Sequence, residues 1–217
     1  MHCALLIAAL ALAVVGWERG FPRVLLPLAL LPLTRILNLT LPLVHVPTIA
    51  WYLGIDVLLL QAAILIKRRL GYSWSQLGQR VRELPLQILV ALAGVGIGVL
   101  HYVLLRPSPL LEVAESQPLI VVSLAVLIST GLVETVVFFG VMLHVMQDGV
   151  GPAAVWLVGA GIAALSVGWM PWPHVAIVLV VGWLHAWVAH RTGCLLGVAL
   201  GRGLSHVICY LVLPLLY

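Results

Sequence analysis

Long runs of apolar residues, separated by short polar connections, constrain this chain more than any other feature. Of its 217 residues, 63% are hydrophobic and 8% are charged, whereas a typical soluble domain has roughly 25% charged residues. A helix needs about 20 mainly apolar residues to cross the hydrocarbon core of a bilayer. Eight apolar segments cover residues 2–16, 22–41, 46–66, 86–105, 118–147, 152–168, 173–190 and 194–216. The sequence therefore predicts an all-α fold, a polytopic membrane helix bundle with about eight transmembrane helices.

No soluble domain fits between these segments, because the longest polar connections cover about residues 67–85 and 106–117. We therefore expect one integral membrane domain over residues 1–217. The first segment lacks the basic residues and the cleavage site of a signal peptide, so it is interpreted as an uncleaved helix. The second segment contains Pro27 and Pro32. Because proline removes a backbone hydrogen bond, this helix is expected to be kinked, tilted or partly re-entrant.

The basic residues gather at one end of the predicted helices. If the 67–85 connection is cytoplasmic, the opposite loops hold only one basic residue, Arg106. The cytoplasmic side then has Arg19, Arg23, Lys67, Arg68, Arg69, Arg80, Arg82 and Arg191. This positive-inside pattern predicts a multi-pass protein of the plasma membrane with both termini on the outer side. The net charge of +4 lies at helix ends rather than along a stripe, so no nucleic-acid partner is expected.

The basic connection also contains the pattern of a helix that lies flat in the headgroup layer. Within residues 73–84, one helical face would carry Trp74, Leu77, Val81 and Leu84, and the charged residues lie elsewhere on the wheel. Such a pattern is typical of an amphipathic interface helix. We expect this helix to anchor the connection at the membrane surface.

Small residues recur every four positions in the last apolar segment, and a shorter series occurs in the fourth. A helix face without large side chains lets another helix approach its backbone closely. The sequence therefore predicts tight helix packing along these faces, within the chain or against other transmembrane subunits. The two series are Gly193, Gly197, Gly201 and Ser205, and Gly94 and Gly98.

Four ionisable residues fall at nearly the same depth in the predicted helices. Counted from the cytoplasmic end of each segment, Glu134 is 13 residues in, His206 12, Asp56 11 and Arg202 8. At a rise of about 1.5 Å per residue, they lie within roughly one and a half turns of each other. A charge at this depth needs a partner or a function, so a shared polar site is expected. Either Arg202 neutralises a carboxylate in a structural pair, or a carboxylate activates water beside a histidine.

The sequence predicts no cofactor. Neither H-E-x-x-H nor G-x-S-x-G occurs, so a zincin or a serine hydrolase of the G-x-S-x-G type is not indicated. The alternative is zinc bound by histidines, or a haem or pigment bound by His101, because neutral imidazole is a good metal ligand. The three cysteines, Cys3, Cys194 and Cys209, form no C-x-x-C pair and are interpreted as packing residues.

Two stretches resemble motifs of the CPBP family of intramembrane proteases, which includes CAAX prenyl endopeptidases and bacteriocin-processing proteins. In ETVVFFG, the family motif E-E-x-x-x-R would put Glu134 at the first glutamate, Thr135 at the second and Phe139 at the arginine. In RTGCLLGVALGRGLSH, an R-T-G turn leads to H-x-x-x-N, with Arg202 at the histidine and His206 at the asparagine. The F-x-x-x-H motif expected between them is absent from AALSVGW. The resemblance implies a CPBP-like core over residues 118–217, after N-terminal helices in residues 1–117.

The resemblance also implies which positions would carry chemistry. In the family, the glutamates and histidines are thought to activate water, while the asparagine helps to hold the oxyanion. The corresponding candidate catalytic residues are Glu134, His206 and Arg202. Asp56, Thr135 and Phe139 are candidate binding residues, and no metal site is predicted. An arginine beside Glu134 would hold the carboxylate ionised, which is unsuitable for a general base that works near neutral pH.

Three functions stay open. The preferred one is a non-catalytic CPBP-like protein, an accessory or scaffolding subunit of a larger membrane complex, with the lipid bilayer and other transmembrane subunits as partners. The second is an active CAAX-type intramembrane endopeptidase that uses Glu134 and His206. The third is a ligand-binding or transport module, in which the mid-membrane charges mark a ligand path. A water-filled cavity at Glu134 would favour the second or third, and a dry contact between Glu134 and Arg202 the first.

Overall fold

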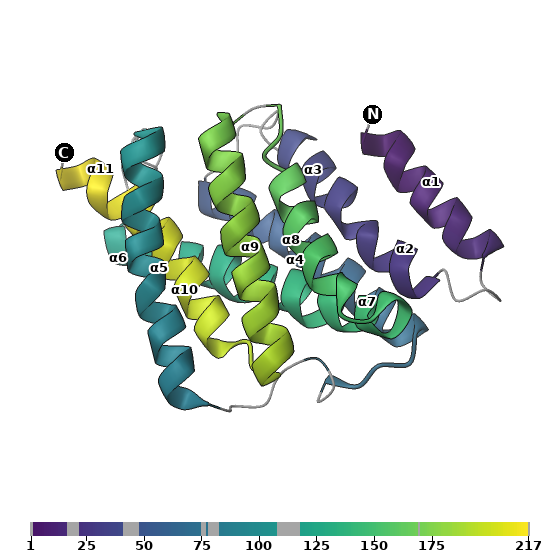
Figure 1. The fold of residues 1–217 in the computed structure, drawn as a ribbon. Coiled ribbons are helices and arrows are strands. Elements are labelled where there is room, and N and C mark those ends of the chain that lie inside the picture. Colours follow the sequence, from purple (N-terminus) through teal and green to yellow (C-terminus); the bar gives the residue numbers. More distant parts are fainter. Residues whose placement is uncertain are drawn as a thin grey trace.

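The computed structural model describes residues 2–16, 22–40, 48–74, 77, 83–107, 118–168 and 170–216. These residues form helices joined by turns, and no strand occurs among them (Figure 1). Five of the helices are long and apolar enough to cross a membrane. The predicted all-α class is therefore confirmed, and the five apolar helices indicate a multi-pass membrane protein.

The five candidate spans are Pro22–Thr40, Leu84–Leu105, Leu119–Val150, Trp172–Thr192 and Leu196–Leu216. Three further helices match the remaining apolar segments: α1 (His2–Val15), α4 (Thr48–Arg69) and α8 (Ala153–Ala164). α1 and α8 are shorter than a straight span requires. The expected total of eight spans is reached only if these three helices also cross the bilayer, and it stays a prediction.

The proline-rich second segment is interrupted as the sequence predicts. α2 (Pro22–Leu28) and α3 (Leu30–Thr40) are separated at Ala29. Pro27 lies inside α2, and Pro32 has no N–H to donate to the carbonyl of Leu28. The separation at Ala29 agrees with the effect expected of these prolines, and a kinked, tilted or re-entrant course stays a prediction.

The helix over residues 119–150 is the longest, with 32 residues. It begins as α6 (Leu119–Val126) and ends as α7 (Leu143–Val150), and two π-helical stretches, η5 (Leu127–Val133) and η6 (Val136–Met142), lie between them. Widened turns of this kind are rare in proteins, and those that do occur are often found at functional sites. Glu134 and Thr135 lie between the two stretches, so the backbone is irregular on both sides of the first motif position.

A short turn connects the last two long helices. α9 (Trp172–Thr192) ends at Gly193, whose φ is 62° and whose N–H donates to the carbonyl of Ala189. Glycine adopts this left-handed conformation without the penalty that a Cβ would add, which explains the R-T-G turn. α10 (Leu196–Val207) then begins, and it continues through η7 (Ile208–Val212) into α11 (Leu213–Leu216).

The small residues bring α5 (Leu84–Leu105) and α10 into backbone contact. A methyl group on Gly94 would overlap the backbone of Gly201, and a Cβ on Gly98 would lie 2.6 Å from the carbonyl oxygen of Ser205. The predicted tight packing is therefore confirmed for this pair of helices. Gly193 is the exception in its series, because a Cβ there would meet nothing within 4 Å and the residue serves as the helix cap.

The two ends of the bundle differ in charge. Figure 1 shows that α1 begins and α11 finishes at the same end of the bundle, the upper end in that view. Lys67, Arg68 and Arg69 form the last turn of α4, and Arg191 lies in the last turn of α9, at the opposite end. This separation is the one expected from the sequence, and the membrane side that each end faces stays a prediction.

The predicted interface helix over residues 73–84 lies largely outside the described residues. The described part packs on the end of the bundle, where Leu77 is 1% exposed and Trp74 contacts the same core. The Nζ of Lys67 lies 4.4 Å from the centroid of the Trp74 ring. The hydroxyl of Tyr72 donates a hydrogen bond to a carboxylate oxygen of Asp148 on α7. These contacts hold the start of the connection against α4 and α7.

Candidate functional site

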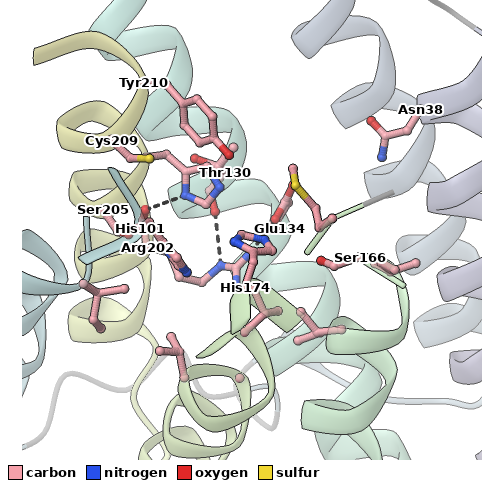
Figure 2. A pocket seen from close by; sticks show the side chains of 18 of the residues that line it. Asn38, His101, Thr130, Glu134, Ser166, His174, Arg202, Ser205, Cys209 and Tyr210 are labelled. Atoms are coloured by element: carbon pink, nitrogen blue, oxygen red, sulfur yellow. Dashed lines mark hydrogen bonds and ion pairs between the residues drawn. The ribbon is translucent and has the colours of Figure 1, made fainter. Parts of the chain in front are cut away.

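A cavity of about 530 Å³ lies inside the bundle (Figure 2). Residues of α3, α4, α5, the 119–150 helix, α8, α9 and α10 line it, together with residues of η7 and of the turn between α8 and α9. Apolar side chains share the wall with hydroxyls, imidazoles and charges. Its charged and histidine side chains are Arg35, His101, Glu134, His174, His185, Arg202 and His206.

The cavity lies toward the end of the bundle that holds the chain termini. Asn38 on its wall is close to the end of α3, His101 is close to the end of α5, and His174 is close to the start of α9. These three helix ends lie at the upper end of Figure 1, away from the basic end. The polar site is therefore nearer to one face of the bundle than to the other.

An ion pair between Glu134 and Arg202 forms part of this wall. Nη2 of Arg202 donates to Oε2 of Glu134, and Nε of Arg202 donates to the carbonyl oxygen of Thr130 at 3.4 Å. The side chain of Glu134 is 26% exposed and that of Arg202 is 11% exposed. Figure 2 shows the two side chains facing each other, with Asn38 of α3 across the cavity. The structure thus combines a direct contact with access from a cavity.

Phe139 and Thr135 do not line the cavity. Both are 0% exposed, and the Thr135 hydroxyl has no hydrogen-bond partner among the described residues. The Phe139 ring lies 5.6 Å from the guanidinium carbon of Arg202, and its edge meets the His185 ring at 6.0 Å between centroids. An aromatic face at this distance attracts a guanidinium. Phe139 therefore supports Arg202 from within the protein rather than contacting a molecule in the cavity.

Asp56 is also not part of the cavity wall. It lies on α4, is 4% exposed, and has a side-chain hydrogen bond with Ser129. Its Oδ2 has no partner among the described residues. Of the six predicted site residues, the structure brings Glu134, Arg202 and His206 together in the cavity.

The orientation of His206 assigns its tautomer. Its Nδ1 lies 3.0 Å from the carbonyl oxygen of Arg202. Because a carbonyl only accepts hydrogen bonds, Nδ1 carries the hydrogen, and Nε2 of the neutral ring is an acceptor. The ring stacks on Tyr210 with 5.8 Å between centroids. His206 thus adds a fixed hydrogen-bond acceptor to the site.

Three other histidines on the wall were not among the predicted site residues. The rings of His101 and His174 lie 5.0 Å apart. Within the described structure, Nε2 of His101 and Nδ1 of both His174 and His185 are buried without a hydrogen-bond partner. The sequence held one signal for this arrangement, because residues eleven apart, such as His174 and His185, lie on the same face of a helix, three turns apart. No sequence pattern showed that this face of α9 meets His101 of α5.

The described residues include no group of three or more histidine, cysteine, aspartate or glutamate side chains that could hold a metal ion. The zinc alternative therefore finds no ligand set in this part of the chain. All three cysteines are free, and Cys209 is the one that lines the cavity. The chemistry that these residues offer is hydrogen bonding from imidazoles and hydroxyls around an ion pair whose two charges neutralise each other.

Comparison of the chain with protein-family models, with curated proteins and with solved structures gives no match. Its function is therefore inferred from the cavity itself. Of the predicted catalytic residues, Glu134 and His206 could take a proton, and Arg202 already holds Glu134. This arrangement is better suited to binding a molecule than to activating water.

Proposed function

We propose that this chain is a non-catalytic, multi-pass membrane protein that binds a small molecule in the cavity beside Glu134 and Arg202. The cavity carries the proposal, because its volume of about 530 Å³ falls within the roughly 300–1,000 Å³ typical of ligand sites. Such sites combine an apolar wall with a few polar groups that orient the ligand. The wall described above has this composition.

The state of Glu134 supports the non-catalytic part of the proposal. A general base needs a carboxylate that is free to take a proton, and a neighbouring guanidinium opposes protonation. Thr135 stands where the family motif has a second glutamate, and it is fully buried. The CPBP-like fold of residues 118–217 belongs to the same proposal, supported by the Gly193 turn and by α10, which brings Arg202 to Glu134.

The expected role as an accessory subunit of a larger membrane complex stays a prediction. Its test is the migration of the protein after extraction in a mild detergent. A stoichiometric complex would support the role, and migration as a single chain would contradict it.

The endopeptidase is the second candidate, and one observation favours it. His206 presents an acceptor nitrogen in the same cavity as the partly exposed carboxylate of Glu134. A water molecule between these two groups would have the partners that hydrolysis needs. Purified wild type should nevertheless cleave no membrane-embedded peptide, and reproducible cleavage that is lost in Glu134→Gln at unchanged stability would establish the protease instead.

A matched pair of substitutions on α9 tests binding. Val181 lines the cavity, whereas its neighbour Val180 is 53% exposed on the outer surface of the bundle and is not on the cavity wall. Val181→Phe should narrow the cavity with a larger side chain on its wall, and Val180→Phe adds the same group outside it. Mass spectrometry of solvent extracts should detect a small molecule with wild type and with Val180→Phe, but much less with Val181→Phe. Equal amounts in all three proteins would contradict binding in the cavity.

A further inference from the structure

We infer that the cavity takes an uncharged amphiphile, a molecule with a hydroxyl-bearing or carbonyl-bearing head and a hydrocarbon chain. The inference rests on the proposed function and specifies the class of ligand. It follows from the ion pair on the wall, from unpartnered imidazole nitrogens, and from the apolar side chains that share the wall with them.

The charges of the wall already have partners. Glu134 and Arg202 pair with each other, and Arg35, the second cation among the described residues of the wall, interacts with another group. A carboxylate or phosphate head would compete with Glu134 for Arg202 and leave Glu134 unpaired. A cationic head would compete with Arg202 for Glu134. Because an unpaired charge at this depth is costly, a head of either sign gains little, and an uncharged head leaves the pair intact.

Three imidazoles of the wall have buried nitrogens without a hydrogen-bond partner in the described structure, and a head that reached them would supply one. His174 is 7% exposed and His185 is 4% exposed, and the Nδ1 atoms of both have no partner among the described residues. Nε2 of His101 is also without a partner in that part of the chain. Each such nitrogen of a neutral ring either donates or accepts a hydrogen bond. Hydroxyl groups do both, so a head with hydroxyls matches these nitrogens in either tautomer.

The rest of the wall suits a hydrocarbon chain. Apolar side chains from several helices face the cavity, and burying a hydrocarbon chain against them removes its apolar surface from any water in the cavity. The apolar residues include Leu39, Ile97, Ile162, Leu165, Val178 and Val181.

Four probes that share a palmitoyl or hexadecyl chain separate the classes of head. They are 1-monopalmitoylglycerol, palmitate, hexadecyl phosphate and hexadecyltrimethylammonium. Each competes with a photoreactive monoacylglycerol for labelling of the full chain in phosphatidylcholine nanodiscs. Monopalmitoylglycerol should compete at about tenfold lower concentration than the three charged probes. Val181→Phe should reduce the labelling about tenfold, and Val180→Phe should leave it unchanged.

A substitution at the polar part of the wall tests the head itself. His174→Leu removes one imidazole, so the monoacylglycerol should label the variant about tenfold less, whereas a photoreactive alkane of the same length should label it as it labels wild type. Melting curves of all variants show whether each is folded. Equal loss of both labels would assign His174 a structural role and overturn its contact with the head.

The remaining outcomes distinguish the inference from the proposed function. A charged probe could reduce the photolabelling of wild type at the lowest concentration, and lose this effect in Val181→Phe. In that case the class of ligand is overturned while binding in the cavity stands. If Val181→Phe and Val180→Phe are photolabelled equally, both without a competitor and with each of the four competing probes, both the ligand class and the proposed function are overturned.

Discussion

At the scale of single residues, Arg202 determines what Glu134 can do. Its guanidinium contacts the carboxylate, the carbonyl oxygen of Thr130 and the ring of Phe139. In the CPBP motif that this stretch resembles, an arginine stands at the position of Phe139, on the same helix as the glutamate. Here a phenylalanine stands at that position, and the arginine comes from α10 to the same carboxylate. The charge of Glu134 is therefore balanced between two helices rather than within one.

Glu134→Gln should destabilise the protein. The amide cannot balance the charge of Arg202, and breaking a buried ion pair typically costs about 3–5 kcal/mol. The lower end of this range is expected, because 26% of the Glu134 side chain is exposed. Melting in a mild detergent measures the effect. A double variant with Arg202→Met should lose less than the sum of the two single changes, and additive losses would show that the pair does not stabilise the fold.

Tyr72 should make the stability depend on pH in the alkaline range. Burial, together with the hydrogen bond to Asp148 and the charge of that carboxylate, raises the pKa of Tyr72 from 10.0 to about 12. Because the folded state binds this proton more tightly, the contribution is fully present below about pH 10 and is lost as the pH rises toward 12. The melting temperature of wild type should therefore fall more steeply than that of Tyr72→Phe between these values. Parallel curves would contradict the contribution of Tyr72.

Depth in the predicted helices indicated a shared polar site, but depth has a clear limit. The distance along a helix rises almost linearly with residue number, so Glu134, Arg202 and His206 could be assigned to one level. Depth does not show the direction in which a helix faces. Asp56 has the right depth, yet it lies beside Ser129 and not on the cavity wall. His174 and His185 could be assigned to one face of α9, but their neighbours depend on how the helices pack.

At the scale of helices, the contact of α5 with α10 positions Arg202. The two backbones meet at Gly94 and Gly201, where neither residue has a side chain to separate them. The long helix approaches α10 from another side, where a Cβ on Gly131 would lie 2.8 Å from the carbonyl oxygen of Ala199. α10 is thus held between two helices, and Arg202 and His206 extend from it into the cavity.

Gly94→Ala should destabilise the protein, and Gly96→Ala should not. A methyl group at position 94 would overlap the backbone of Gly201, whereas one at position 96 of the same helix meets nothing within 4 Å. Overpacking typically costs about 1–3 kcal/mol. Melting temperatures of the two variants in one detergent provide the comparison. Equal values would mean that α5 and α10 do not pack this closely.

Helical periodicity predicted the long helix but not its irregular turns. The π-helical stretches η5 and η6 consist of apolar and small residues that would also suit an α-helix. Each shift from i→i+4 to i→i+5 hydrogen bonding rotates the following side chains relative to an ideal helical wheel. A wheel drawn from 118 to 147 therefore assigns the wrong faces beyond Leu127. Close packing by small residues was predictable, because glycine spacing depends only on local sequence.

At the scale of the whole molecule, the charge difference between the two ends predicts its orientation. Cys3 is exposed near the start of α1, and Cys194 and Cys209 are buried. A membrane-impermeant maleimide applied to intact cells should label Cys3, because the positive-inside rule places the termini outside. In a Cys3→Ser background, Arg68→Cys should react only after the cells are permeabilised. Labelling of Arg68→Cys in intact cells would reverse the orientation.

The position of the cavity near one end of the bundle affects the route by which a lipid-like ligand would reach it. Asn38, His101 and His174 all lie close to helix ends on the side of the chain termini. A lipid-like molecule held there would enter and leave through the monolayer on that side, without passing the midplane of the bilayer. Occupancy of the cavity would then follow the composition of that single monolayer, and changes confined to the other monolayer would leave it unaffected.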